Sequence, residues 1–173
     1  GWLNINVLRV DLSNPYVYVD TLINKESVNK LTTTKTLASD YGAVAAINAG
    51  FFNPLGGGSG YPDGPIVQSG KLISAWSEFN RYSDVMGSFS IDNLNNVLYD
   101  YWKTSMTLET PSGKSIAVTQ YNKPSRSNYT DVTIFDRRWG KNSIGVTKDY
   151  SDIVEIVVTE GVVTEIRQAK PAV

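Results

Sequence analysis

Apolar and polar residues alternate along the chain in short runs that are typical of β-strands joined by tight turns. Residues 3–10 and 16–20 place β-branched and aromatic residues between polar ones, and turn residues (Asp11 to Pro15) separate the two runs. We therefore expect a strand in each run at the start of the chain.

The same rhythm returns in the second half of the chain, where paired apolar runs flank short polar turns. Each pair predicts a β-hairpin, because Ser-Gly, Glu-Gly and Asn-rich turns favour tight reversals. The predicted hairpins span residues 66–74 around Ser69-Gly70, 86–101 around 93–96, 105–120 around 111–114, and 153–167 around Glu160-Gly161, with a further single strand at 131–136.

One stretch has a different pattern. Residues 32–41 predict a short helix with a threonine N-cap and with Gly42 just past its end. The next residues, Ala43–Ile47, are all apolar and are bounded by Gly42 and Gly50, which is typical of a strand buried on both faces. We expect the helix to lead directly into this central strand.

These elements together predict a β-rich α+β fold. It would contain about ten strands in a mixed or antiparallel sheet of hairpins, with one or two short helices packed on the central buried strand. No linker divides the 173 residues, so we expect residues 1–173 to form a single domain.

Composition narrows the classes of function. Hydrophobic residues make up 41% and charged residues 19% of the chain, as in globular proteins. The net charge is −1 and no basic block is present, so we expect no nucleic-acid partner. No apolar run reaches the roughly 18 residues that a membrane span needs, so we expect no membrane span.

The chain contains no Cys and no His. A thiol nucleophile, a Ser-His-Asp triad and the usual zinc sites are therefore excluded within this chain. Proton transfer has to come from Asp, Glu, Lys, Tyr or water. We expect no cofactor; any bound metal would be an oxygen-liganded ion such as Ca²⁺ or Mg²⁺.

The end of the predicted central strand is the first candidate site. Asn48 stands where the strand leaves the core, and its amide can both donate and accept hydrogen bonds. Gly50 permits close approach of a ligand, and Phe51 and Phe52 would give one ring to the core and one to a cleft wall. The alternative is structural: Asn48 would only satisfy the backbone of a turn.

A glycine-rich segment, residues 53–65, follows the candidate site and includes Tyr61, Asp63 and Gly64. Two interpretations stay open, a loose surface loop or a lid over a binding site. Asp63 is the best-placed acid, although an ordinary Asp-Gly turn explains it more simply, because Asp is a standard turn residue. Residues 137–140 could likewise present cations to a ligand or form a solvated turn with Trp139 packed inward.

Asn48-Ala49-Gly50-Phe51-Phe52 resembles the Asn-Gly-Gly-Phe-Phe hallmark of the phosphodiester glycosidase family, which includes the enzyme that uncovers mannose 6-phosphate on lysosomal proteins and bacterial proteins associated with exopolysaccharide. The segment from Gly64 to Leu72 is similar to the apolar strand and Asp-Gly-Lys-like turn that follow in the family, with Ser69 at the first turn position. Ala49 departs from the pattern. The similarity spans nearly the whole chain and corresponds to the family's N-terminal half.

The resemblance implies a hydrolase that cleaves a sugar 1-phosphodiester at the anomeric carbon, on a glycoconjugate or a cell-surface polysaccharide. It implies Asn48 and Asp63 as catalytic residues. It further implies a substrate site formed by Gly50, Phe51, Phe52, Tyr61 and Gly64. Trp76 is a further aromatic candidate for stacking on a sugar ring.

The family's later Arg-(Ser/Thr)-Ala stretch and Asp-Gly-Gly-Gly-Ser motif do not occur in the chain. We therefore expect a longer protein whose C-terminal half, in the same or a second polypeptide, completes the active site. The abundance of Asn, Thr, Ser and Tyr without Cys favours a secreted or surface location on a bacterium. The alternative function is a non-catalytic glycan- or cell-wall-binding or structural module that kept the fold.

Overall fold

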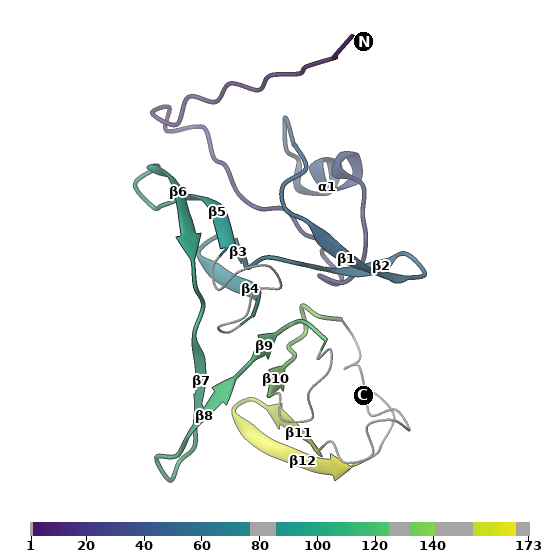
Figure 1. Ribbon diagram of the computed structural model, residues 1–173, viewed down its shortest axis with the longest axis vertical. Helices are drawn as coiled ribbons and strands as arrows, with labels where there is room; N and C mark the ends of the chain where they lie inside the picture. The colour runs from purple at the N-terminus through teal and green to yellow at the C-terminus, as the bar shows by residue number, and fades with distance from the viewer. Residues whose placement is uncertain (1, 77–85, 125–131, 141–153, 169–173) are drawn as a thin grey trace.

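The structure is a computed structural model of the 173-residue chain, and it describes residues 2–76, 86–124, 132–140 and 154–168. The described part is β-rich, with one short helix, and the predicted α+β class is confirmed (Figure 1). Its elements are α1 (Thr34–Tyr41), β1 (Phe52–Gly56), β2 (Ser59–Pro62), β3 (Ile66–Gln68), β4 (Lys71–Trp76), β5 (Met86–Ile91), β6 (Val97–Trp102), β7 (Met106–Glu109), β8 (Ser115–Val118), β9 (Gln120–Tyr121), β10 (Thr133–Ile134), β11 (Val154–Thr159) and β12 (Val162–Gln168).

The strands of the described residues form several small sheets rather than one large sheet. A four-stranded sheet has the order β10-β9-β4-β3, in which β9 and β10 are parallel and the other pairs are antiparallel. The remaining strands pair as two-stranded hairpins, β1-β2, β5-β6, β7-β8 and β11-β12. The predicted mixed and antiparallel pairing is therefore confirmed.

Tight turns at glycine fix the hairpins where the sequence predicted them. Ser69 and Gly70 have φ of 48° and 73°, and Glu160 and Gly161 have φ of 51° and 78°. Two successive positive φ values define the type I′ turn, whose twist matches that of the strands on either side. The predicted hairpins around Asn93–Asn96 and Pro111–Lys114 also form, as β5-β6 and β7-β8.

Helix α1 ends at the predicted residue, Tyr41, and begins at Thr34, two residues after the predicted start, with a threonine N-cap as expected. The Thr33 hydroxyl accepts a hydrogen bond of 3.2 Å from the amide of Thr36, which satisfies one of the free N–H groups of the first turn. Gly42 ends the helix with φ of 66°, a left-handed conformation that suits glycine.

The predicted central strand does not form. Residues 43–51 lie outside the strands, and the side chains of Val44 and Ile47 are 106% and 76% exposed. Helix α1 therefore does not pack on a buried strand, and none of its residues is buried. The apolar run had the right composition, but a buried strand also needs partner strands on both edges.

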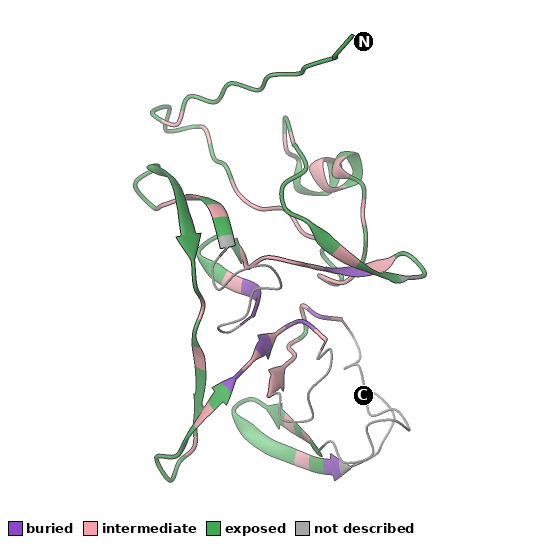
Figure 2. Ribbon diagram, viewed as in Figure 1, coloured by how far each residue is buried: buried purple, intermediate pink, exposed green. Residues whose placement is uncertain are grey.

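Four other expectations are corrected. Residues 3–10 and 16–20 are extended but belong to no strand, and their apolar side chains are mostly exposed (Figure 2). The strand predicted at 131–136 shortens to β10, with residue 131 outside the described part. The glycine-rich segment is not a loose loop, because it forms the β1-β2 hairpin, which turns at Gly57-Gly58; its role as a lid stays a prediction.

The core of the described residues lies where β2, β4 and the turn after β10 meet. Tyr61, Trp76 and Trp139 form its aromatic cluster, with Val28 and Phe135 packed against it. Ile73, Ala75 and Val118 are the other buried hydrophobic residues. This core supports the segment that carries Asp63, which follows Tyr61 by two positions.

Candidate functional site

Asn48 lies on an exposed segment beside the helix rather than at the end of a buried strand. Its Oδ1 accepts a hydrogen bond from the hydroxyl of Thr34, the first residue of α1. The described part of the chain offers no acceptor to the Asn48 Nδ2 group, so its two N–H donors face solvent. The amide can therefore donate to a ligand oxygen.

The two aromatic residues after Asn48 are both exposed. Phe51 is 87% exposed and Phe52 is 55% exposed, so the expected division between one core ring and one cleft ring is wrong. A side chain at Gly50 would meet no heavy atom within 4 Å, which leaves the backbone there open to approach. Gly50, Phe51 and Phe52 therefore form an exposed segment, which we call the 50–52 segment.

A backbone hydrogen bond connects Asp63 to the 50–52 segment. The Asp63 amide donates to the carbonyl oxygen of Phe51 at 2.9 Å, beside the pairing of Phe52 with Pro62. Asp63 Oδ1 accepts a hydrogen bond of 2.6 Å from Asn53 Nδ2. The fold thus brings Asp63 next to the aromatic end of the motif, whereas the hydrogen bond of Asn48 goes to the helix.

Tyr61 and Gly64 flank Asp63 and have structural partners. Tyr61 is 2% exposed and packs edge-to-face on Trp76, with ring centroids 6.4 Å apart. Tyr61 and Trp76 are therefore core residues, and their rings do not present a face to a sugar. The backbone carbonyl of Gly64 accepts a hydrogen bond of 3.2 Å from Lys123 Nζ.

Lys123 is fully buried beneath the turn formed by Pro62, Asp63 and Gly64, which we call the 62–64 turn. Its ammonium group donates to the carbonyl oxygens of all three residues. The same group lies 5.1 Å from the centroid of the Trp76 ring. A buried ammonium group needs hydrogen-bond acceptors of this kind, because burying a charge without them is costly.

The residues just before Lys123 form a second polar network. Asn122 is buried; its Nδ2 donates to the Ile73 carbonyl at 2.8 Å and to Asp136 Oδ1 at 2.9 Å. Its Oδ1 accepts from the Asp136 amide at 3.0 Å. Asn122 thereby connects β4 to the turn after β10, and this turn is held in place beside the core.

Asp136 also contacts Arg138 and Tyr121. Burial by itself would raise the pKa of Asp136, but hydrogen bonds from Arg138, Tyr121 and Asn122 outweigh it and lower the pKa to about 2. Burial and the Asp136 carboxylate raise the pKa of Tyr121. The hydrogen bond to Asp136 raises the pKa of Arg138. Asp136 is therefore a charged structural anchor.

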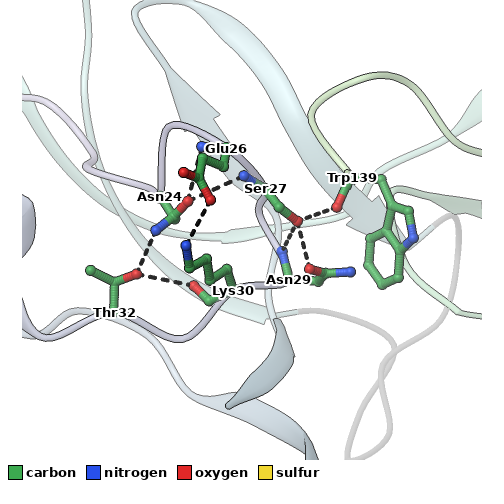
Figure 3. A network of polar contacts seen from close by, with 7 residues as sticks. All are labelled: Asn24, Glu26, Ser27, Asn29, Lys30, Thr32 and Trp139. Atoms are coloured by element: carbon green, nitrogen blue, oxygen red, sulfur yellow. Dashed lines mark hydrogen bonds and ion pairs between the residues drawn. The ribbon is translucent and has the colours of Figure 1, made fainter. Parts of the chain in front are cut away.

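The turn at 136–140 is also tied to the segment before the helix (Figure 3). The Ser27 hydroxyl donates to the Trp139 carbonyl, and the Val28 amide donates to the Arg138 carbonyl at 2.7 Å. Of the two interpretations of residues 137–140, the structure favours the turn with Trp139 packed inward, since Trp139 is 3% exposed.

The sequence did not single out Lys123, Asn122 or Asp136. Each lies at the end of a predicted strand, where polar residues are common and carry no distinctive signal. Apart from Arg138, two positions after Asp136, the hydrogen-bond partners of their side chains lie 14 to 61 positions away along the chain, so only the tertiary structure identifies them. A fully buried lysine has no local sequence signature.

Within the described residues, no cluster of three or more acidic side chains that could hold a metal ion is present. The helical structure of the same residues lacks the length and apolar character required to cross a membrane.

Comparison with known proteins gives no match among family models, curated proteins or solved structures.

Proposed function

We propose that the chain contributes part of the active site of a hydrolase that cleaves sugar 1-phosphodiesters at the anomeric carbon. The observation that carries the proposal is the hydrogen bond between the Asp63 amide and the Phe51 carbonyl. It joins the aromatic end of the family-like motif to the one acidic residue expected beside it. A further support is that Phe51 directly follows Gly50, where an added side chain would meet no atom within 4 Å.

The reaction makes modest demands on the protein. Water adds to the anomeric carbon while the bond from that carbon to the phosphate oxygen breaks, and the electron pair leaves with the phosphate as a phosphomonoester. Positive charge develops on the sugar ring in the transition state, and a nearby carboxylate stabilises it. Asp63 supplies that carboxylate, with one oxygen held by Asn53 and the other available.

In this proposal, Asn48 and the backbone near Gly50 donate hydrogen bonds to the phosphate and the sugar hydroxyl groups. The exposed Nδ2 of Asn48 can donate to a ligand oxygen, because Thr34 already holds its Oδ1. The exposed rings of Phe51 and Phe52 offer apolar faces beside that donor. Substrates of this class belong to glycoconjugates or cell-surface polysaccharides, which would place the protein outside the cell or on its surface.

We propose that a complementary polypeptide segment bearing the Asp-Gly-Gly-Gly-Ser motif completes the cleft. The support is the exposed apolar surface of the hairpins, for example Ile156 and Ile166, a cross-strand pair on β11-β12 that is 60% and 69% exposed. Apolar surface of this kind commonly marks a contact with another polypeptide.

The test is sugar release by the protein as its gene encodes it, with the α-1-methylphosphodiester of N-acetylglucosamine as substrate. We expect Asp63→Asn to lower kcat by roughly 10²- to 10⁴-fold and Asn48→Ala mainly to raise KM. Asp100→Asn, on exposed strand β6, and Asn93→Ala, in an exposed turn, are the matched controls. Full turnover by Asp63→Asn would show that the carboxylate has no catalytic part.

A second candidate, glycan binding without cleavage, is favoured by the aromatic face of β5-β6. Phe89, Tyr99 and Tyr101 lie on one face of this hairpin, with 58%, 80% and 72% of their surface exposed. Exposed aromatic rings bind the apolar faces of sugars. Retention of the chain on a polysaccharide column that Tyr99→Ala abolishes, with no sugar release, would select this candidate.

A further inference from the structure

The side chain of Lys123 is buried beneath the 62–64 turn and donates hydrogen bonds to it. Lys123 has no exposed surface, and its Nζ donates to the carbonyls of Pro62, Asp63 and Gly64, the last two at 3.1 and 3.2 Å. Three successive carbonyl oxygens that converge on one ammonium fix the backbone of the turn. The direction in which the Asp63 side chain leaves the turn is fixed with it.

Trp76 reinforces this arrangement from β4. The Trp76 Nε1 donates to the Asp63 carbonyl at 3.0 Å, and the Trp76 ring lies 5.1 Å from the Lys123 ammonium. The Asp63 carbonyl thus accepts from both Lys123 and Trp76. A cation over an aromatic ring is favourable, and more so where water is excluded.

We propose that Lys123 is a positioning residue that holds Asp63 in the orientation its catalytic role requires. The proposal rests on the function proposed above and adds a residue that lies two positions after the end of β9 and 60 positions from Asp63. Loss of the ammonium would leave three carbonyl oxygens without this donor in a buried region, which is costly. The turn would rearrange to reach water, and the Asp63 carboxylate would move with it.

The expected effect is on turnover rather than on substrate binding. A displacement of about 1 Å in a reacting group can lower the rate roughly 10²-fold. Lys123 itself is fully buried and makes no contact with solvent or ligand, so KM should change little. A lysine that only stabilised the fold would lower the folded fraction and leave kcat per folded molecule unchanged.

The absence of cysteine from the chain permits a chemical rescue. Lys123→Cys is prepared in the full protein, aminoethylated in denaturant with 2-bromoethylamine to restore an ammonium of nearly the length of lysine, and refolded. Wild type taken through the same refolding and Lys114→Cys, at an exposed position, are the controls. Lys123→Met, of similar volume, replaces the cysteine variant if the latter folds only after alkylation.

Two readouts are taken on the folded variants. The first is kcat and KM for sugar release from the phosphodiester. The second is hydrogen exchange of the Asp63 amide and the Trp76 indole N–H, which needs no activity. Without the ammonium we expect kcat to fall about 10²-fold and exchange at both groups to rise at least about tenfold, with both returning toward wild type after aminoethylation.

Wild-type kcat and wild-type exchange in a folded Lys123→Cys or Lys123→Met protein would overturn the proposal. Faster exchange with unchanged kcat would also overturn it, since Lys123 would then be merely structural. If wild type releases no sugar, the proposed function fails; the exchange data then decide separately whether Lys123 holds the turn, and unchanged exchange would refute that as well.

Discussion

Asn122 is a buried residue whose side chain joins β4 to the turn after β10. Its side chain donates to the Ile73 carbonyl and the Asp136 carboxylate and accepts from the Asp136 amide. Such a residue cannot be replaced by a smaller apolar one without leaving buried groups unsatisfied. The adjacent Lys123 depends on the same backbone for its position under the 62–64 turn.

We predict that Asn122→Ala lowers the free energy of unfolding by about 1–3 kcal/mol, because the Ile73 carbonyl and Asp136 amide lose their partner in the interior. Urea denaturation measures this. Asn93→Ala, at an exposed turn, should stay within about 0.5 kcal/mol of wild type. Equal stability of the two variants would mean that the Asn122 network does not form.

The stability of the protein should fall at acidic pH through Asp136. Its pKa is about 2 in the folded protein, below the unfolded value of about 3.9. The stabilisation is therefore fully present above about pH 4 and is lost as pH falls toward 2. Because the group is partly exposed, screening reduces the effect to about 1 kcal/mol.

We predict that Asp136→Asn removes this part of the pH dependence. The difference in unfolding free energy between wild type and variant, measured by urea denaturation, should be larger at pH 6 than at pH 2.5. Asp100→Asn, on an exposed strand, is the control. A wild-type-minus-variant difference that is constant between these pH values would contradict the assigned role of Asp136.

The residues that hold the site were beyond sequence reasoning for a physical reason. Lys123 and Asn122 make contacts with groups 49 to 61 positions away, and no local periodicity encodes such contacts. Asp63 could be singled out as a candidate because an acid beside a glycine-rich motif is a local feature, and its catalytic role stays a prediction. Tyr61 was expected in the substrate site as an aromatic residue that can stack on a sugar, whereas its burial depends on Trp76, 15 positions away.

At the level of elements, local turn chemistry was a reliable guide and apolar composition was not. Ser69-Gly70 and Glu160-Gly161 form the expected tight turns because glycine at the second turn position adopts the required positive φ without strain. Residues 43–47 have the composition of a buried strand, but burial depends on partner strands that the run itself does not specify. The helix was predicted for the same reason as the turns, because its N-cap Thr33 and its terminal Gly42 are local features of the sequence.

The β1-β2 hairpin depends on a glycine for space. A side chain at Gly60 would lie 2.8 Å from the Asn53 carbonyl oxygen and 3.0 Å from Leu31 Cδ2. We predict that Gly60→Ala destabilises the protein by roughly 1–3 kcal/mol through this overlap, measured by thermal or urea unfolding. Asn53 also holds Asp63, so sugar release should fall as well.

Gly50→Ala is the matched control, because a side chain there meets no atom within 4 Å. Its stability should equal that of wild type. If substrate approaches the backbone at Gly50, its KM should nevertheless rise. A Gly60→Ala protein as stable as Gly50→Ala would contradict the close packing of the hairpin on residue 31.

At the scale of the molecule, buried apolar residues are few compared with exposed ones among the residues that the structure describes. The aromatic core is confined to the meeting point of β2, β4 and the 136–140 turn, whereas the hairpins of the described residues carry apolar side chains on the surface (Figure 2). This distribution favours a protein that uses its hairpins for contacts with other polypeptides or with ligands.

We predict that the isolated chain increases the fluorescence of the dye 8-anilinonaphthalene-1-sulfonate in its folded state. Replacement of the exposed pair Ile156 and Ile166 by threonine should reduce this fluorescence, because threonine keeps strand propensity and removes apolar surface. Unfolding midpoints should change little. Unchanged fluorescence in the double variant would show that the β11-β12 face is covered in solution.

The central claim is hydrolysis of a sugar 1-phosphodiester at the anomeric carbon beside Asp63. The most direct measurement is hydrolysis of that substrate in ¹⁸O-labelled water by the protein as its gene encodes it, followed by mass spectrometry of both products. The account predicts the label on the released sugar and loss of release in Asp63→Asn. Label on the phosphate, or release that survives Asp63→Asn, would contradict it.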